Sequence, residues 1–212
     1  MRIGIFGGTF DPVHLGHLRA AEEFAEALDL ARVLMVLSAA PPHREAPSTP
    51  PEDRLHMLRL AVDDAPRLEA SDMELKREGP SYTLDTIRQV RAETGSPFPF
   101  LALGMDAFEE IATWHQPAEV LEEAHLVILT RPGYRADLLA PLPEGSPAMY
   151  TSGEGMFLHR SGATLRELKV TAMDISSSQV RRLAGGGRSI RYLVPDTVFQ
   201  YIQQSGIYTR RS

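Results

Sequence analysis

Short apolar runs recur along the chain and alternate with longer segments of a different spacing. Such compact runs are typical of strands that are buried on both faces of a parallel sheet. Four of them are clear, and they cover residues 3–6, 32–37, 98–103 and 124–130. A fifth run, residues 168–173, alternates weakly between apolar and polar positions and is predicted to be the last strand.

Between these runs, apolar residues recur every three or four positions, as in helices that bury one face. Helices are predicted at residues 14–24, 52–64, 81–95, 176–185 and about 195–205. Strands that alternate with helices in this way predict one doubly wound α/β domain over residues 1–212, with a parallel sheet of about five or six strands. Two regions are harder to assign: residues 73–78 are predicted as a short strand, and residues 134–161 as an irregular insertion with one strand near 156–158.

Composition narrows the class of protein without identifying it. The chain has 212 residues, of which 43% are hydrophobic and 24% charged, as in an ordinary globular domain. The sequence lacks cysteine, which excludes disulfides and thiolate catalysis. Its net charge of −6 argues against a nucleic-acid partner. Neither a secretion signal nor an apolar stretch near 18 residues is visible, so a cytoplasmic location without a membrane partner is expected.

The first predicted strand leads into a turn suited to phosphate. The strand stops at Gly7 and Gly8, where a missing β-carbon allows the backbone to turn sharply or to approach a ligand closely. The helix that follows begins near His14, so its free N–H groups and positive dipole end point at the crevice beyond the strand. His14 and His17 lie three positions apart, on one face of the first helical turn. Two imidazoles at this position suit the oxygens of a phosphate.

The whole string of residues 7–17, GGTFDPVHLGH, resembles the opening of the nucleotidyltransferases that carry a His-x-Gly-His signature. Three other interpretations of the string are weaker. A structural turn with two incidental histidines explains less of it, and one His-x-x-His pair without cysteine is a poor zinc site. A dinucleotide-binding turn requires G-x-G-x-x-G, which this segment lacks. No metal ligands are therefore predicted from the protein itself.

Four further segments resemble motifs of the bacterial nicotinate-nucleotide adenylyltransferases, a family of that superfamily, and they occur in the same order. They are Pro-Pro-His-Arg at 41–44, Ser-Tyr-Thr-Leu-Asp-Thr at 81–86, the region of Trp114, and Ile-Ser-Ser-Ser at 175–178 followed by Arg181. Arg44 stands where the family has lysine; a guanidinium can still hold a phosphate, and bidentately. The resemblance covers essentially the whole chain and implies the Rossmann-like fold of these transferases.

The resemblance also implies roles for individual residues. ATP would be bound by the backbone after the first strand (Gly7, Gly8, Thr9 and Phe10), by His14 and His17, by Gly104 and Asp106, and by Ile175, Ser176, Ser177, Ser178 and Arg181. Nicotinate mononucleotide would be bound by Arg44, Ser81, Tyr82, Thr83 and Trp114. The catalytic residues would be His14, His17 and Arg44, with His17 as the main group stabilising the transition state. Mg²⁺ would accompany ATP and bridge its phosphates.

Each of these assignments has a plainer structural alternative. The proline-rich segment around 41–44 is also typical of a surface connection. Residues 81–83 and 176–178 match helix caps, and Asp106 matches the start of a helix after the strand end. A single tryptophan is more often part of a core than a platform for a ligand. Arg181, however, is a cation near a helix N-terminus, which the helix dipole disfavours unless an anion lies there.

The resemblance implies transfer of the adenylyl group of ATP to nicotinate mononucleotide, giving nicotinate adenine dinucleotide and pyrophosphate. The attacking phosphate is itself the nucleophile, which fits a chain without an evident nucleophile–base pair. Two alternatives remain: a sister transferase that uses nicotinamide mononucleotide or phosphopantetheine, and a non-catalytic nucleotide-binding module on the same fold. The sequence does not indicate the oligomeric state.

Overall fold

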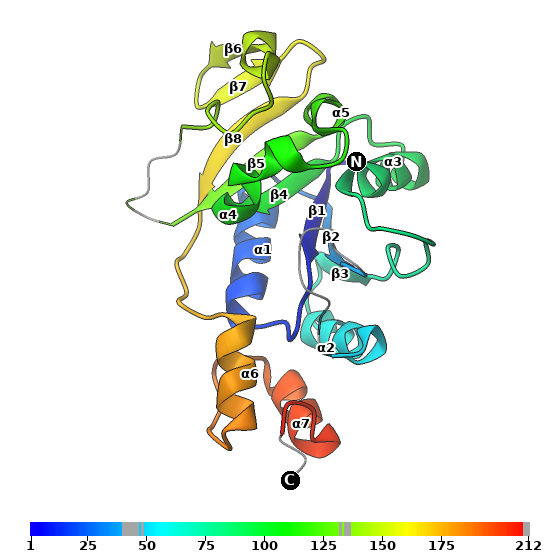
Figure 1. Ribbon diagram of the computed structural model, residues 1–212, viewed down its shortest axis with the longest axis vertical. Helices are drawn as coiled ribbons and strands as arrows, with labels where there is room; N and C mark the ends of the chain where they lie inside the picture. Colours follow the sequence, from blue (N-terminus) through cyan, green and yellow to red (C-terminus); the bar gives the residue numbers. More distant parts are fainter. Residues whose placement is uncertain (40–46, 48, 132, 134–136, 210–212) are drawn as a thin grey trace.

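The computed structural model describes residues 1–39, 47, 49–131, 133 and 137–209, and a single mixed sheet runs through them (Figure 1). Its strands lie in the order β3-β2-β1-β4-β5-β8-β7-β6. The strands that the structure describes are β1 (Ile3–Gly8), β2 (Arg32–Leu37), β3 (Leu68–Ser71), β4 (Phe100–Gly104), β5 (His125–Thr130), β6 (Tyr150–Gly153), β7 (Met156–His159) and β8 (Thr164–Lys169). From β3 to β8 all neighbours are parallel, whereas β7 and β6 are antiparallel additions at one edge.

Helices connect the parallel strands and cover both faces of the sheet. Within the described residues they are α1 (Leu15–Ala27), α2 (Pro51–Val62), α3 (Thr83–Thr94), α4 (Met105–Glu109), α5 (Pro117–Glu123), α6 (Ser177–Gly185) and α7 (Asp196–Ser205), with short 3₁₀ turns at Ile111–Thr113 and Ser146–Met149. The doubly wound α/β fold predicted from the alternation of strands and helices is therefore confirmed.

Alternating side chains of the buried strands divide the core into two layers. On β2, Val33 and Met35 pack with α1 and α2 in one layer, to which α6 and α7 also contribute. Leu34 and Val36 point to the other face and pack with α3, α4 and α5. Because both faces of the central strands are covered, these strands read as continuous apolar runs in the sequence.

The order of the strands creates a switch point at β1. From β1 the chain moves outward to β2 and β3 on one side, and it then returns to β4 and β5 on the other side. The connections after β1 and β4 therefore leave the same edge of the sheet in opposite directions, and a crevice opens between them. Gly8 at the end of β1 and Gly104 at the end of β4 mark this edge.

Two strand predictions need correction. Residues 73–78 form turns and bends, and the strand lies just before them at β3. The last parallel strand, β8, occupies Thr164–Lys169 and not 168–173, because its partner β5 ends at Thr130, which pairs with Lys169. The strand predicted near 156–158 is confirmed as β7, and the described part of the segment 134–161 holds a second strand, β6, which pairs with it in a hairpin. Among the described residues the sheet thus has six parallel strands, within the five or six expected, and two antiparallel ones in addition.

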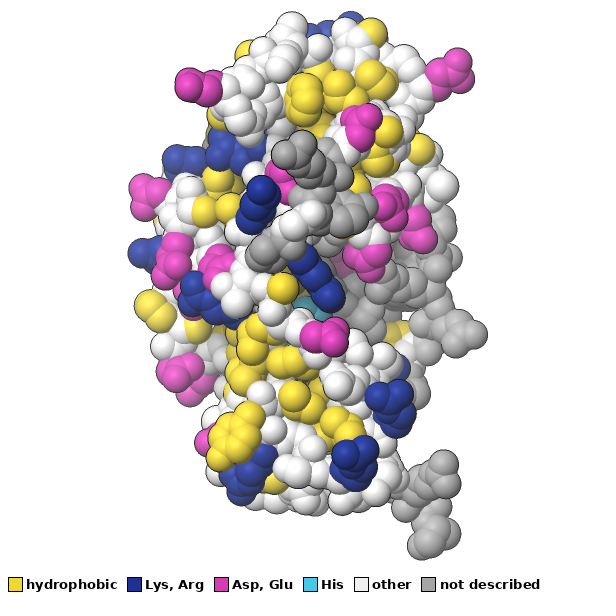
Figure 2. Space-filling model, turned by 90° about the vertical axis from the view of Figure 1, so that its left-hand side faces the viewer, with side chains coloured by type: hydrophobic (Ala, Val, Ile, Leu, Met, Phe, Trp, Pro, Cys, Tyr) yellow, Lys and Arg dark blue, Asp and Glu magenta, His cyan; other side chains and the backbone are white. Residues whose placement is uncertain are grey.

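The surface carries charges of both signs. On the face shown in Figure 2, Lys and Arg side chains are interspersed with Asp and Glu side chains. No helix among the described residues is both long and apolar enough to cross a membrane.

Candidate active site

A cavity of about 220 Å³ lies at the switch point of the sheet. The ends of three neighbouring strands contribute to it: Gly7 and Gly8 from β1, Ser38 just after β2, and Leu103 from β4. Thr9, just after β1, also lines it, and further residues come from the segment before β4 and from the connection after it: Glu74, Ser81, Tyr82, Thr83, Thr86, Ala107, Glu110, Trp114 and His115. This is the position at which open α/β sheets bind ligands.

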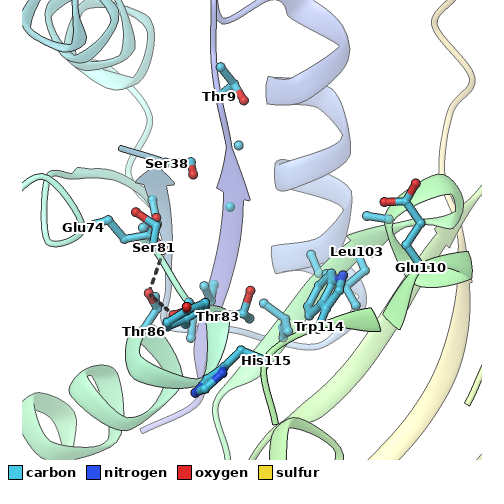
Figure 3. Close-up of a pocket in the computed structure, with 18 residues that line it drawn as sticks. Thr9, Ser38, Glu74, Ser81, Thr83, Thr86, Leu103, Glu110, Trp114 and His115 are labelled. Carbon is cyan, nitrogen blue, oxygen red and sulfur yellow. Dashed lines mark hydrogen bonds between the residues drawn. The ribbon is translucent and has the colours of Figure 1, made fainter. Parts of the chain in front are cut away.

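The cavity has two walls of different chemistry (Figure 3). One wall is polar, since Glu74, Ser81 and Thr86 lie close together beside the start of α3. The opposite wall carries the indole of Trp114, with Glu110 beyond it. Trp114 is partly buried and packs against the core layer of α3, α4 and α5, yet it also lines the cavity. It therefore belongs to the core and to the cavity wall at once, and both interpretations of the tryptophan hold in part.

The start of α3 forms the polar wall. Tyr82 is its N-cap residue, and its side chain makes no capping hydrogen bond, so the first N–H groups of the helix face the cavity without a cap from Tyr82. The Oγ1 of Thr86 donates a hydrogen bond of 2.7 Å to the buried Glu74 carboxylate, and the guanidinium of Arg77 donates one of 2.6 Å to the same Thr86 oxygen. This chain of contacts fixes the first turn of α3 against the segment before it.

Tyr82 also contacts the residue after Trp114. Its ring stacks on His115, with the ring centroids 4.1 Å apart and the planes inclined by 22°. The stack joins the start of α3 to the turn after α4, so the two walls of the cavity are in contact at one end.

The two histidines of the signature cap each other at the start of α1. His14 is the N-cap residue, and its Nδ1 accepts the backbone N–H of His17 at 3.3 Å. In return, the Nδ1 of His17 accepts the backbone N–H of His14, also at 3.3 Å. The rings stack with their centroids 3.6 Å apart. Because both Nδ1 atoms accept, the proton of each neutral ring resides on Nε2, which is left as a donor.

Both imidazoles are neutral near pH 7 in the free protein. Burial lowers the pKa of His14 to about 4, although a backbone hydrogen bond opposes the shift. Burial and the neighbouring His14 lower the pKa of His17 to about 3. Phe10 contributes to this burial, since its ring meets His17 edge-on at a centroid distance of 5.1 Å. The pair thus offers two hydrogen-bond donors without permanent charges.

The serine motif at the start of α6 docks on the turn between β1 and α1. The Oγ of Ser177 donates a hydrogen bond of 2.9 Å to the carbonyl of Pro12, and Arg181 donates one of 2.6 Å to the carbonyl of Asp11. Ser176 is the N-cap residue and accepts the N–H of Gln179 at 3.2 Å. The N-termini of α1 and α6, about 160 residues apart in the sequence, are therefore joined through one turn.

The residues predicted from the sequence thus fall into two groups on either side of that turn. Gly7, Gly8, Thr9, Ser81, Tyr82, Thr83 and Trp114 line the cavity. His14, His17, Ile175, Ser176, Ser177, Ser178 and Arg181 lie outside its lining, at the starts of α1 and α6. Arg44 lies outside the described residues. The roles given to these residues in catalysis and binding stay predictions.

The structure adds detail on three of the predicted residues. Phe10 is 1% exposed, so its side chain belongs to the core, although its backbone remains in the turn. Gly104 and Asp106 lie at the end of β4 but outside the cavity lining, where Ala107 and Glu110 stand instead. A β-carbon on Gly104 would come within 2.8 Å of the Asp106 carboxylate, so this side chain folds back over the strand end.

The sequence analysis missed several residues of the site. Ser38, Glu74, Thr86 and His115 line the cavity, and Arg54 and Tyr208 contact the turn after β1. One signal was available: Arg54 interrupts the apolar face of its helix, whose buried residues include Leu55, Met57 and Leu58. The contacts of Tyr208 join positions almost 200 residues apart, which a single sequence cannot reveal.

Across the described part of the chain, no cluster of three or more His, Asp or Glu side chains could hold a metal ion. A divalent ion at this site would therefore need ligands other than such a cluster of side chains, and the phosphate oxygens of a nucleotide are ligands of this kind.

Comparison with known proteins agrees with this geometry. A sequence model of the family described as cytidylyltransferase-like matches residues 5–183. A relative from Pseudomonas syringae pv. tomato, named probable nicotinate-nucleotide adenylyltransferase, is 44% identical over 209 residues, which cover 98% of this chain and 93% of the relative. A relative of the same name from Geobacter metallireducens is 42% identical and covers 99% of both chains.

Solved structures share the fold at much lower sequence identity. The nicotinic acid mononucleotide adenylyltransferase of Plasmodium falciparum, solved in complex with NaAD, superposes with a TM-score of 0.71 at 16% identity. The match covers 98% of this chain and 97% of that one. A putative nicotinate-nucleotide adenylyltransferase from Vibrio parahaemolyticus gives a TM-score of 0.65 at 17% identity, with coverage of 100% and 98%. At this identity the likeness concerns the fold.

Proposed function

The chain belongs to the cytidylyltransferase-like family and, within it, to the nicotinate-nucleotide adenylyltransferases, and from this premise we propose that it transfers the adenylyl group of ATP to nicotinate mononucleotide. The products are nicotinate adenine dinucleotide and pyrophosphate, a step of NAD biosynthesis. One observation carries the proposal to this chain: the start of α3 and the indole of Trp114 line the cavity at the switch point, and the β1 turn that also lines it leads into the start of α1, where His14 and His17 cap each other.

The reaction needs alignment more than acid–base chemistry. A phosphate oxygen of nicotinate mononucleotide attacks the α-phosphorus of ATP, and the bond from that phosphorus to the bridging oxygen of the β-phosphate breaks. Pyrophosphate leaves with the electron pair. The attacking group is already largely dianionic near pH 7, since its second pKa is about 6, and it requires no base. The protein must hold two anions in line and stabilise the charge that develops on the transferring group.

The histidine pair is placed for this stabilisation. Each Nε2–H can donate to a phosphate oxygen, because both Nδ1 atoms are occupied by backbone N–H groups. The pair is rigid before substrate arrives, since each ring is fixed by a cap and by the stack with the other ring. Donors that need no reorganisation are the ones that stabilise a transition state most effectively. We assign the larger share of this transition-state stabilisation to His17.

The polar wall explains a preference for nicotinate. The substrate carries a carboxylate on its pyridine ring, and the first N–H groups of α3 at Tyr82 and Thr83 are donors at the positive end of a helix dipole. Trp114 on the opposite wall can stack on the pyridine ring, whose cationic form gains from an aromatic face. An amide in place of the carboxylate would lose the charge that this helix end favours.

The proposal also includes a magnesium ion, two arginines that bind phosphate groups, and the location and partners of the protein. Mg²⁺ bound with ATP would neutralise part of the charge on its phosphates, while Arg181 and Arg44 hold phosphate groups of the leaving group and the substrate. Arg181 is assigned to the leaving group because of its position in the first two turns of α6. A cation is unfavourable near this end of the helix dipole unless an anion is bound beside it. A cytoplasmic location and the lack of nucleic-acid and membrane partners stay predictions.

The test is pyrophosphate release from ATP and Mg²⁺ with nicotinate mononucleotide, measured beside nicotinamide mononucleotide and a His17→Ala variant. We expect release with the nicotinate substrate and a fall in kcat on the order of 10²–10³ in the variant, as for removal of one donor to a developing anion. Equal rates with the two mononucleotides would refute the carboxylate argument. Absence of release with either would refute the enzyme and favour a nucleotide-binding module.

A further inference from the structure

A buried arginine lies behind the β1 turn in the first turn of α2. Arg54 is 1% exposed, the largest of the side chains that are completely buried among the described residues. It occupies an inward position of α2, in series with Met57, Leu58 and Ala61 on the apolar face. A cation is disfavoured twice here, by desolvation and by the positive end of the helix dipole. Such a position calls for a specific partner.

The guanidinium spans three separate segments of the chain. Its Nη1 donates to the carbonyl of Thr9 at 2.7 Å and to the carbonyl of Ser38 at 3.0 Å, and its Nε donates to the carbonyl of Thr49 at 3.2 Å. Thr9 follows β1 and Ser38 follows β2, and both line the cavity; Figure 3 shows Thr9 beyond the tip of β1 and Ser38 beside the tip of β2. Arg54 therefore ties together the two strand ends that bound the crevice.

The charge of Arg54 persists at this position. Burial lowers the pKa of the guanidinium, and the nearby Asp11 carboxylate acts in the opposite direction. A guanidinium nevertheless stays protonated in proteins. In a chain with a net charge of −6, a fixed cation just behind the turn raises the local potential at the place where two anionic nucleotides would meet.

We propose that Arg54 is a positioning residue for adenylyl transfer, which holds the Thr9 turn against the end of β2 and supplies a fixed positive charge behind it. This inference rests on the proposed function. The backbone donors of Gly8, Thr9 and Phe10 can act on a phosphate only if the turn keeps its place relative to the strand ends. A fork of donors to carbonyls of both segments fixes that spacing in a way that a single apolar contact would not.

Packing alone does not require an arginine at this position. Well-packed apolar residues can replace buried ionic groups in a core without loss of stability, and sometimes with a gain. A purely structural Arg54 would therefore predict that an apolar side chain of similar length leaves kcat intact in the folded protein. A positioning Arg54 predicts that kcat falls while the KM values for both substrates change little, because the misplaced turn acts on the transition state.

The experiment compares Arg54→Met and Arg54→Lys with a matched control, Arg59→Met, on the exposed side of the same helix. Arg59 is exposed and pairs with Asp72 at 3.3 Å, away from the turn. kcat and both KM values are measured by pyrophosphate release well below the melting temperature of each variant. We expect kcat to fall about 100-fold in Arg54→Met, the size of effect that a misplacement of about 1 Å produces. Arg54→Lys, which restores the charge and some donors, should recover part of the loss.

The outcomes separate this inference from the function on which it rests. An active wild-type protein with a folded Arg54→Met variant of unchanged kcat would overturn the positioning role alone. If Arg54→Met does not fold, Arg54→Lys decides, and wild-type kcat in that variant would overturn the need for the guanidinium fork. Failure of both variants to fold would make the role structural and end the proposal. An inactive wild-type protein would remove the proposed function itself.

Discussion

At the scale of single residues, the site depends on positions where a side chain is absent. The mutual capping of His14 and His17 brings the His14 ring over Gly16. A β-carbon at Gly16 would lie 3.1 Å from the Nδ1 and 3.2 Å from the Cε1 of that ring. These distances are tighter than ordinary van der Waals contact. The glycine between the histidines is therefore explained by the ring beside it, and its backbone needs no unusual conformation.

Gly16→Ala should separate activity from stability. Alanine favours a helix over glycine by about 1 kcal/mol, which should offset much of the cost of the contact. The His14 ring, however, must move by a few tenths of an ångström, and the stack with His17 moves with it. We expect a melting temperature close to that of the wild type and a kcat lower by about tenfold, as for a modest loss of alignment. Thermal unfolding and steady-state kinetics of one preparation would check this, and unchanged kcat would contradict it.

The two glycines at the end of β1 should respond in opposite ways to alanine. A β-carbon on Gly7 meets no atom within 4 Å, and Gly7 lines the cavity. A β-carbon on Gly8 would lie 2.8 Å from the buried ring of Phe10. Gly7→Ala should keep or slightly raise stability and raise KM, because its methyl group enters the substrate space. Gly8→Ala should destabilise the fold by about 1–3 kcal/mol, since Phe10 must shift.

Denaturant unfolding and KM measurements on both alanine variants would check these expectations. The two glycines are adjacent in the sequence and serve as controls for each other. A Gly7→Ala variant that unfolds as easily as Gly8→Ala would contradict the prediction.

At the scale of elements, the end of the described chain reaches back to the β1 turn. The hydroxyl of Tyr208, which follows α7, donates a hydrogen bond of 2.6 Å to the Asp11 carboxylate. Asp11 is 4% exposed, and Arg181 of α6 approaches the same carboxylate at 3.9 Å. Burial and the Asp11 contact raise the pKa of the Tyr208 phenol well above its usual value, so the phenol stays protonated as a donor. The turn is thus supported by α2, by α6 and by the segment after α7.

Tyr208→Phe should affect nucleotide handling as well as stability. The variant leaves a buried carboxylate without its hydroxyl partner, at a cost of about 1–3 kcal/mol. It should also let Asp11 shift and raise the KM for ATP, since Arg181 and the turn share that carboxylate. The control is Tyr201→Phe, which removes a similar hydrogen bond between a tyrosine and Asp53 at the other side of α7. Equal KM values for ATP in the two variants would contradict a role for the Asp11 contact.

The elements that the sequence predicts well are those buried on both sides. The strands β1, β2, β4 and β5 lie in the interior of the sheet, so nearly every residue in them is apolar and the pattern is unmistakable. The strand β3, with the sequence LEAS, lies at an edge and buries one residue fully. An edge strand needs few apolar residues, so the sequence pattern did not identify β3 and the strand was predicted in the neighbouring segment, residues 73–78.

Of the antiparallel edge, the sequence predicted a strand at β7 but not its partner β6, for a related reason. Only one residue of the hairpin β6–β7, His159, is fully buried, and its strands of four residues are held mainly by backbone pairing. Backbone hydrogen bonds leave no trace in the order of side chains. In contrast, the segments that form the site were found because turn glycines, helix starts and histidines impose requirements on residue type. Arg54 was missed because its three partners are carbonyls, which any residue supplies.

At the scale of the whole molecule, several histidines lie in surroundings that lower their pKa values and so favour the neutral imidazole. Besides His14 and His17, burial and the nearby Arg166 and Arg2 lower the pKa of His125 to about 4, and burial lowers the pKa of His159. The core packing around the sheet thus keeps histidines of both the site and the far edge neutral. In the unfolded chain the same side chains would take up a proton near pH 6.5.

This difference predicts a loss of stability on mild acidification. Below about pH 6.5 the unfolded state binds protons that the folded state refuses until about pH 4 for His14 and His125 and about pH 3 for His17, so the free energy of unfolding falls with pH across this window. Each such histidine contributes a slope of up to ~1.4 kcal/mol per pH unit. Hydrogen bonds and ion pairs outweigh burial and lower the pKa values of Glu23, Asp72 and Glu123, so protonation of these carboxylates reduces stability in the same direction as the pH falls.

Urea unfolding at steps between pH 7 and pH 4.5 measures the slope directly. In a double variant with His14→Gln and His17→Gln, the slope of the free energy of unfolding against pH should decrease by the contribution of two histidines. His125 and His159 continue to contribute to it. If the free energy of unfolding of the wild type were constant across this range, the histidine pair would be accessible to protons, and the neutral donors proposed for phosphate binding would not exist in the free protein.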